Sequence, residues 1–176
     1  MGLKLEIKVK VGMDTFINKV EASGIITVDL LDYEPKEKSF FLDIKPFLFM
    51  EMIVKEKEFK AALETYDWLS LKGRSVAVGC SVDTIIPTWA YMLLVNNLMG
   101  IATHIDFCSA AALDRLLWRD AVLATDFSYL TGEKVVVRAR PNLDPSLYMA
   151  AAEKLKPVVK TLLYGEAGMP KVIAKN

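Results

Sequence analysis

The chain is poor in the residues that most often form metal and disulfide sites. Its 176 residues include one histidine, His104, and two cysteines, Cys80 and Cys108. Two cysteines cannot form a disulfide framework, and no charged segment leads into an apolar one at the start, so we expect a cytoplasmic protein. Structural zinc requires four ligands, and no histidine is close to the cysteines, so we predict no metal site.

Charge of one sign, long apolar runs and phosphate-binding loops are also lacking. Lysine plus arginine and aspartate plus glutamate number 22 each, which disfavours binding to nucleic acid or to an anionic membrane. The most apolar stretch, residues 87–98, is interrupted by Asn96 and Asn97 and is far below the roughly 18–20 apolar residues that span a bilayer. Neither a Walker A pattern nor GxGxxG occurs. We therefore expect no nucleic-acid partner, no membrane partner and no nucleotide site of a known type.

The composition that is present is that of a packed protein. The apolar fraction of 53% and the charged fraction of 25% are ordinary for a globular chain, and the length favours one domain over residues 1–176. Residues 3–11 alternate between apolar and charged side chains, which predicts a strand. Gly12 and Met13 follow, so translation can equally begin at Met13, and residues 1–12 are an optional N-terminal extension.

Strands and helices alternate along most of the chain, a pattern typical of βαβ units and parallel sheets. Near the start we predict a short helix at 14–20, strands at 25–30 and 39–42, and a long helix from Asp43 to about Tyr66. Further along we predict strands at 74–80, 103–108, 134–139 and 160–164, and helices at 87–99, 109–125 and 145–156. The predicted fold is α/β, with a parallel or mostly parallel sheet in three layers and helices on both faces.

An internal repeat divides the chain into units of about 59 residues, 54–112 and 113–171. The matched positions are Asp67, Trp68, Leu71, Gly73 and Val76 in the first unit and Asp126, Phe127, Leu130, Gly132 and Val135 in the second, every pair 59 residues apart. Each unit reads as a helix, an aromatic turn ending in glycine, a strand, a helix opened by proline, and a closing strand. We therefore predict two duplicated units, with chance similarity between α/β patterns as the alternative.

Ligands of open parallel sheets bind at the carboxyl ends of the strands, which directs attention to the loop after residue 80. A thiol at Cys80 beside helix N-termini can have a lowered pKa, with Asp83 as base or ligand and Ser81 between them. The structural alternative is a buried cysteine and a helix-capping aspartate. Cys108 follows the next strand, whereas His104 begins that strand and is expected at the opposite edge, which argues against a Cys-His dyad.

Two arginines follow a third strand, where Arg138 and Arg140 could clamp an anion. The alternative is ion pairing with Asp106, Asp144 or Glu166. The helix at 87–98, which contains Trp89, is apolar around most of its circumference and must be covered on several sides. Either the N-terminal elements cover it, or a second subunit does. We predict a homodimer whose contact includes this helix or its duplicate from Pro145.

The string Cys80-Ser-x-Asp83, followed by Pro87-Thr-Trp-Ala-Tyr-Met92, resembles a bacterial family known as domain of unknown function 2480. The resemblance covers residues 13–176 and implies an accessory role beside the SUF system of iron–sulfur cluster assembly. In the family pattern a cysteine follows the Gly-Glu pair near the C-terminus. Here Ala167, Gly168, Met169 and Pro170 occupy that stretch. A thiol pair with Cys80, if the family uses one, is therefore unavailable unless Cys108 substitutes.

These observations rank three functions. The first is an accessory or binding protein, linked by the resemblance to iron–sulfur assembly through a protein partner or a small anionic ligand. The second is a small enzyme that uses Cys80 and Asp83, and the third is an oligomeric scaffold without a ligand. No cofactor is implied, and the sequence leaves open whether the chain is an enzyme. The candidate ligand or partner site comprises Cys80, Ser81, Asp83, Trp89, Cys108, Arg138, Arg140 and Glu166.

Overall fold

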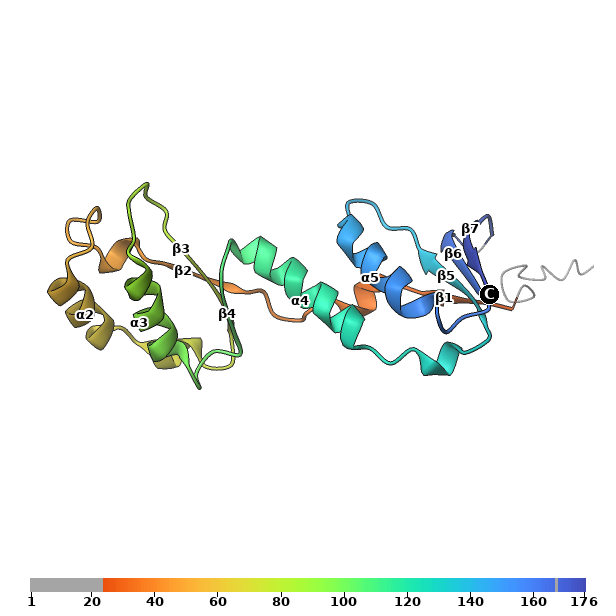
Figure 1. Cartoon of the computed structure of the whole chain (residues 1–176), viewed down its shortest axis with the longest axis horizontal. Helices are drawn as coiled ribbons and strands as arrows, with labels where there is room; N and C mark the ends of the chain where they lie inside the picture. Colours follow the sequence, from red (N-terminus) through yellow and green to blue (C-terminus); the bar gives the residue numbers. More distant parts are fainter. Residues whose placement is uncertain (1–23, 167) are drawn as a thin grey trace, which may run out of the picture.

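A computed structural model describes residues 24–166 and 168–176. The predicted strand at 3–11 and the predicted helix at 14–20 lie outside the described residues. The described part forms two lobes, which lie one after the other along the longest axis (Figure 1). Each lobe is built on its own sheet.

The first sheet has four strands in the order β1-β5-β6-β7. Its strands are β1 (Ile25–Val28), β5 (Lys134–Arg138), β6 (Thr161–Gly165) and β7 (Lys171–Lys175). The first three strands run parallel, with Ile25 opposite Lys134 and Val135 opposite Leu162. Strand β7 is antiparallel to β6 and has an irregular register between Leu162 and Leu163.

The second sheet has three parallel strands in the order β2-β3-β4. They are β2 (Phe40–Asp43), β3 (Ser75–Gly79) and β4 (His104–Phe107). The central strand, β3, is buried from Val76 to Gly79, as expected for a strand covered on both faces.

Two helices accompany each sheet. They are α2 (Glu56–Thr65) and α3 (Thr88–Leu98) in the lobe of the second sheet, and α4 (Ala110–Ala124) and α5 (Pro145–Leu155) in the lobe of the first. Short 3-10 helices follow or precede strands at η1 (Leu30–Tyr33), η2 (Lys45–Phe47), η3 (Trp68–Leu71) and η4 (Ser128–Leu130). The side chains of Ser109 and Asp144 accept hydrogen bonds from backbone N–H groups in the first turns of α4 and α5, so both helices begin where a capping residue stands.

Each lobe has its own hydrophobic core. Phe59 of α2 is fully buried in one core, and Phe127, which precedes η4, is buried in the other. Helix α4 reaches both lobes (Figure 1). The Trp118 indole N–H donates to the carbonyl of Leu30 at 2.8 Å, and Asp114 accepts the backbone N–H of Ser39, the residue before β2, at 2.7 Å. Helix α4 therefore links the two lobes.

The prediction of an α/β fold with mostly parallel strands is confirmed, but the strands form two sheets rather than one. In the second sheet, Val76 faces α2 and α3, and α4 contacts β3, whose Ala77 is fully buried on the opposite face. Helices therefore cover both faces there. The division arises because β1 pairs with β5, more than a hundred residues later, while β2 to β4 pair among themselves.

The same order of elements occurs in both predicted units. Units 54–112 and 113–171 each contain a helix, a 3-10 helix, a strand, a helix and a strand, although α4 begins three residues before the predicted boundary. Gly73 and Gly132, 59 residues apart, both have φ of 77°, a backbone conformation that glycine adopts at little cost. The duplication and the single-domain assignment remain predictions.

One predicted element was wrong, and one strand was not predicted. The long helix expected from Asp43 to Tyr66 is instead the 3-10 helix η2, a turn, and α2, because the chain reverses between Phe49 and Ile53. Met50 and Glu51 adopt φ of 51° and 57° in that turn, which no helix permits. Strand β7 was not predicted, although Val172 and Ile173 are the β-branched residues that strands favour.

Candidate functional site

The predicted site residues fall at the carboxyl ends of both sheets. Val78 lies opposite Phe107, so Cys80 and Cys108 follow neighbouring strands of the second sheet. Arg138 lies opposite Gly165, so Arg138 and Glu166 stand at the carboxyl edge of the first sheet. The single site edge expected from the sequence is therefore divided between the two lobes. The reason is that the strands carrying these residues pair within two separate sheets.

At the edge of the second sheet, Asp43 is the centre of the hydrogen bonding. One carboxylate oxygen accepts the backbone N–H groups of Lys45 and Ser81, both at 3.0 Å, and the other accepts the Ser81 hydroxyl at 2.6 Å. Burial alone would raise the pKa of Asp43, but these hydrogen bonds outweigh it and the pKa lies below its ordinary value. Ser81 is thus tied to Asp43 and joins the loop after β3 to the end of β2.

The other candidate residues of this lobe do not form a hydrogen-bonded group like that around Asp43. Cys80 is half-buried, and Asp83 is exposed in the loop that leads to α3. Trp89 packs edge-on against Phe59, with 5.9 Å between ring centroids, so its ring belongs to the core of this lobe. Cys108 is also half-buried, and burial, with a contribution from Asp106, raises the pKa of its thiol. Cys108 is therefore less ionised at neutral pH than a free cysteine.

At the edge of the first sheet, Asp29 holds both predicted arginines. Its carboxylate accepts the Nε and an Nη of Arg140 and one Nη of Arg138, the last at 3.3 Å. It also accepts the backbone N–H of Leu31 and so caps η1. The arginines were expected to pair with Asp106, Asp144 or Glu166. Glu166 does lie 4.0 Å from Arg138, but the main partner is Asp29.

The charge pairing lowers the pKa of Asp29. The hydrogen bond from Arg140 is the largest cause, and burial opposes it. Asp144, one of the carboxylates expected to pair with these arginines, lies 3.3 Å from Arg115 of α4 instead and caps α5. Of the two interpretations of Arg138 and Arg140, an anion clamp or ion pairing within the chain, the contacts with Asp29 favour ion pairing.

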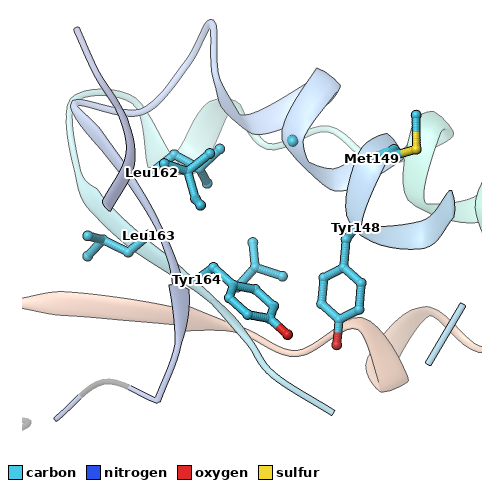
Figure 2. A pocket seen from close by; sticks show the side chains of 8 residues that line it. Tyr148, Met149, Leu162, Leu163 and Tyr164 are labelled. Atoms are coloured by element: carbon cyan, nitrogen blue, oxygen red, sulfur yellow. The ribbon is translucent and has the colours of Figure 1, made fainter. Parts of the chain in front are cut away.

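Tyr148 of α5 connects this charged cluster to the apolar interior of the lobe. Its hydroxyl accepts the backbone N–H of Arg140 at 2.9 Å, and burial raises its pKa. The ring of Tyr148 packs edge-on against Tyr164 of β6, with 5.4 Å between centroids. Figure 2 shows the two hydroxyls pointing the same way, away from Met149.

On the other side of the two tyrosine rings lies a cavity of about 230 Å³ between α5 and the strands of the first sheet (Figure 2). Its lining consists of apolar and aromatic side chains only: Val137, Tyr148, Met149, Ala152, Leu162, Leu163, Tyr164 and Ile173. Met149, Tyr164 and Ile173 are exposed, so the cavity opens to solvent. Sequence reasoning missed this cavity because β7, which supplies Ile173, was not predicted.

His104 begins β4, at the opposite edge from Cys80 and Cys108. Its Nδ1 lies 3.3 Å from the Ser75 hydroxyl of the neighbouring strand. The sequence predicts His104 at the start of its strand, on the edge opposite the cysteines, and the structure places it there.

Asp29 and Asp43 are the site residues that sequence reasoning missed, and they have the same local arrangement. Each accepts the backbone N–H two residues ahead in a 3-10 helix that follows a strand. Each is also bound by a residue two positions after the end of a central strand, and these residues, Ser81 and Arg140, are 59 apart. The spacing of the repeat thus relates Ser81 to Arg140 but does not mark the two aspartates, which lie before the first unit.

Among the residues that the structure describes, no group of three or more histidine, cysteine, aspartate or glutamate side chains is arranged to hold a metal ion. No helix within 24–166 and 168–176 is both long and apolar enough to cross a membrane.

A family model described as a protein of unknown function, DUF2480, matches residues 14–174, which run from before β1 into β7. The chain belongs to the DUF2480 family. The resemblance found in the sequence is thereby confirmed, and both lobes lie inside the matched region of DUF2480. No curated protein and no solved structure shows a significant match to the chain.

Proposed function

We propose that this DUF2480 chain is a non-catalytic binding protein that holds an uncharged, mostly apolar ligand in the cavity beside α5. The observation that supports this most directly is the cavity lining, which consists of apolar and aromatic side chains. Binding pockets for small molecules are lined predominantly by such side chains. An engineered cavity of about 150 Å³ can hold benzene, so about 230 Å³ accommodates a substituted ring or a medium alkyl chain.

The carboxylates at the strand ends favour binding over catalysis. Asp29 is engaged by two arginines and a backbone N–H, and Asp43 by Ser81 and a backbone N–H. The hydrogen bonds hold both groups ionised and oriented toward the chain itself. A general base must instead be able to reach a proton on the substrate. The enzyme alternative that uses Cys80 and Asp83 has no comparable geometric support.

The test uses n-octanol as the probe and Ala152→Leu as the variant that fills the cavity. Ala152 lines the cavity and is half-buried on α5, so a larger apolar side chain occupies the space that the probe would take. We expect n-octanol to raise the melting temperature of the parent chain in proportion to its binding. The variant should bind at least about tenfold more weakly, which corresponds to roughly 1.4 kcal/mol.

The matched control is Ala61→Leu, at an exposed position of α2 in the other lobe, which should bind n-octanol like the parent chain. Failure of n-octanol to stabilise the parent chain would refute the proposal. Equal binding by the Ala152→Leu variant would place the probe elsewhere and refute it as well.

The assembly proposed for this chain is a homodimer. Exposed apolar side chains support it, since Met92 of α3 and Met99, which follows the end of α3, are both exposed. The accessory role in SUF iron–sulfur assembly, and with it a cytoplasmic site of action, remains a proposal that rests on the family resemblance. Calorimetric titration of the purified chain with a purified SUF assembly complex tests it, and no heat of binding at micromolar concentrations would count against it. A scaffold without a ligand remains the alternative if n-octanol does not bind.

A further inference from the structure

Two tyrosine rings stand nearly at a right angle in the lining of the cavity beside α5 (Figure 2). The ring centroids of Tyr148 and Tyr164 are 5.4 Å apart, and the planes of the rings make an angle of 82°. A flat ring that lies parallel to one tyrosine is therefore nearly perpendicular to the other. Aromatic rings prefer offset stacking and edge-to-face contact, and a flat aromatic ligand in this corner can make one contact of each kind.

Two further features of the lining favour an aromatic ligand over a saturated one. The thioether of Met149, at the mouth of the cavity, makes favourable contacts with aromatic rings. The hydroxyl of Tyr148 accepts the backbone N–H of Arg140 at 2.9 Å, so its ring is held in position before a ligand enters. A saturated ligand of the same size gains the burial of its apolar surface but not these directed contacts between aromatic groups.

The size and charge of the cavity limit the ligand further. Its volume of about 230 Å³ is roughly one and a half times that of an engineered cavity that holds benzene, which corresponds to about nine carbon atoms, or two fused rings. No charged side chain is among the described residues that line the cavity, so a charged ring compound would lose its hydration without gaining a partner. We infer that the ligand is an uncharged bicyclic aromatic compound, and this inference rests on the proposed function.

The experiment compares two probes that share one carbon skeleton, 2-naphthol and decahydro-2-naphthol. Both are uncharged at pH 7 and carry one hydroxyl group, which can remain in water at the mouth of the cavity. Calorimetric titration of the full chain measures both dissociation constants, with n-octanol as the probe of the cavity itself. We expect 2-naphthol to bind at least about tenfold more tightly than decahydro-2-naphthol, which corresponds to roughly 1.4 kcal/mol. Hydrophobicity alone predicts the opposite order, because the saturated compound exposes more apolar surface to water.

Tyr164→Leu tests whether this preference comes from the tyrosine rings. The variant keeps an apolar side chain in the lining and removes one ring of the pair. We expect the preference for 2-naphthol to fall at least about threefold, while n-octanol binds within about threefold of the parent chain. Tyr164→Phe retains the ring and should keep the full preference. The matched control is Phe107→Leu, which removes a ring from an edge-to-face pair with Tyr91 in the other lobe and should also keep it.

The outcomes separate this inference from the proposed function. Failure of n-octanol to bind refutes the proposed function, and the inference falls with it. If n-octanol binds but decahydro-2-naphthol binds as tightly as 2-naphthol or more tightly, the proposed function stands and the aromatic ligand is overturned. A preference that survives Tyr164→Leu, or that Phe107→Leu abolishes, overturns its assignment to the two tyrosines. Should Tyr164→Leu lose n-octanol binding, Met149→Leu at a 71% exposed position replaces it, and an unchanged preference for 2-naphthol then overturns the inference.

Discussion

Replacement of Asp29 by asparagine tests whether the charged cluster at the end of β1 stabilises the lobe of the first sheet. The Asp29 side chain is 12% exposed and accepts hydrogen bonds from Arg138 and Arg140. Asparagine has the same shape and can still cap η1 by accepting the N–H of Leu31, because asparagine and aspartate are equally good caps. The substitution therefore removes the negative charge and leaves the cap in place.

The expected loss of stability is intermediate. Breaking a fully buried ion pair costs about 3–5 kcal/mol, but the arginine side chains here are 34% and 40% exposed, so water and salt screen the interaction. We therefore expect Asp29→Asn to lower the free energy of unfolding by about 1–2 kcal/mol. For a chain of this length that corresponds to a fall in melting temperature of roughly 2–8 °C.

The effect should depend on pH in a defined direction. The pKa of Asp29 is lowered below its ordinary value of 3.8, so the carboxyl group ionises more readily in the folded state than in the unfolded state. The stability that Asp29 adds is then complete above the unfolded pKa and is lost as the pH falls through the folded pKa. In urea titrations the free energies of unfolding of the parent chain and of Asp29→Asn should differ at pH 7 and become equal in strong acid.

Asp32→Asn is the matched control, because it removes the same charge from an exposed position of η1. We expect it to change the free energy of unfolding by less than about 0.5 kcal/mol. If Asp29→Asn is equally mild, or if its effect does not diminish at low pH, the argument that Asp29 stabilises this lobe through its arginines is wrong.

Further predictions concern the backbone, the core and the thiols. Gly73→Ala and Gly132→Ala should each destabilise by about 1 kcal/mol in thermal unfolding, because both residues have φ of 77° and open space where a Cβ would stand; unequal losses would contradict the equivalence of the two turns. Phe59→Ala should cost about 3–5 kcal/mol, since Phe59 is fully buried, and an effect under 1 kcal/mol would contradict this packing. Cys108 should react with a thiol reagent more slowly than free cysteine at pH 7, because burial raises its pKa; rapid reaction would contradict that environment.

The local pattern of the sequence was sufficient to place most elements. Strand β5 was expected at 134–139 and runs from Lys134 to Arg138, and helix α5 was expected at 145–156 and runs from Pro145 to Leu155. Both could be predicted because alternation, proline at a helix start and capping residues act within a few residues of chain. The helix from Asp43 to Tyr66 was mispredicted because the chain reverses near Met50. The reversal uses non-glycine residues with positive φ, and no local sequence pattern predicts such a turn.

The sequence by itself determined the α/β class, the alternation of elements and the 59-residue spacing between matched positions such as Gly73 and Gly132, because each depends on short-range periodicity or on comparison of the chain with itself. Only the tertiary structure decided which strands share a sheet, that Asp29 binds arginines more than a hundred residues away, and that a cavity opens beside Tyr148. The physical reason is that strand pairing and side-chain packing depend on contacts between distant segments, and many pairings satisfy the same local pattern.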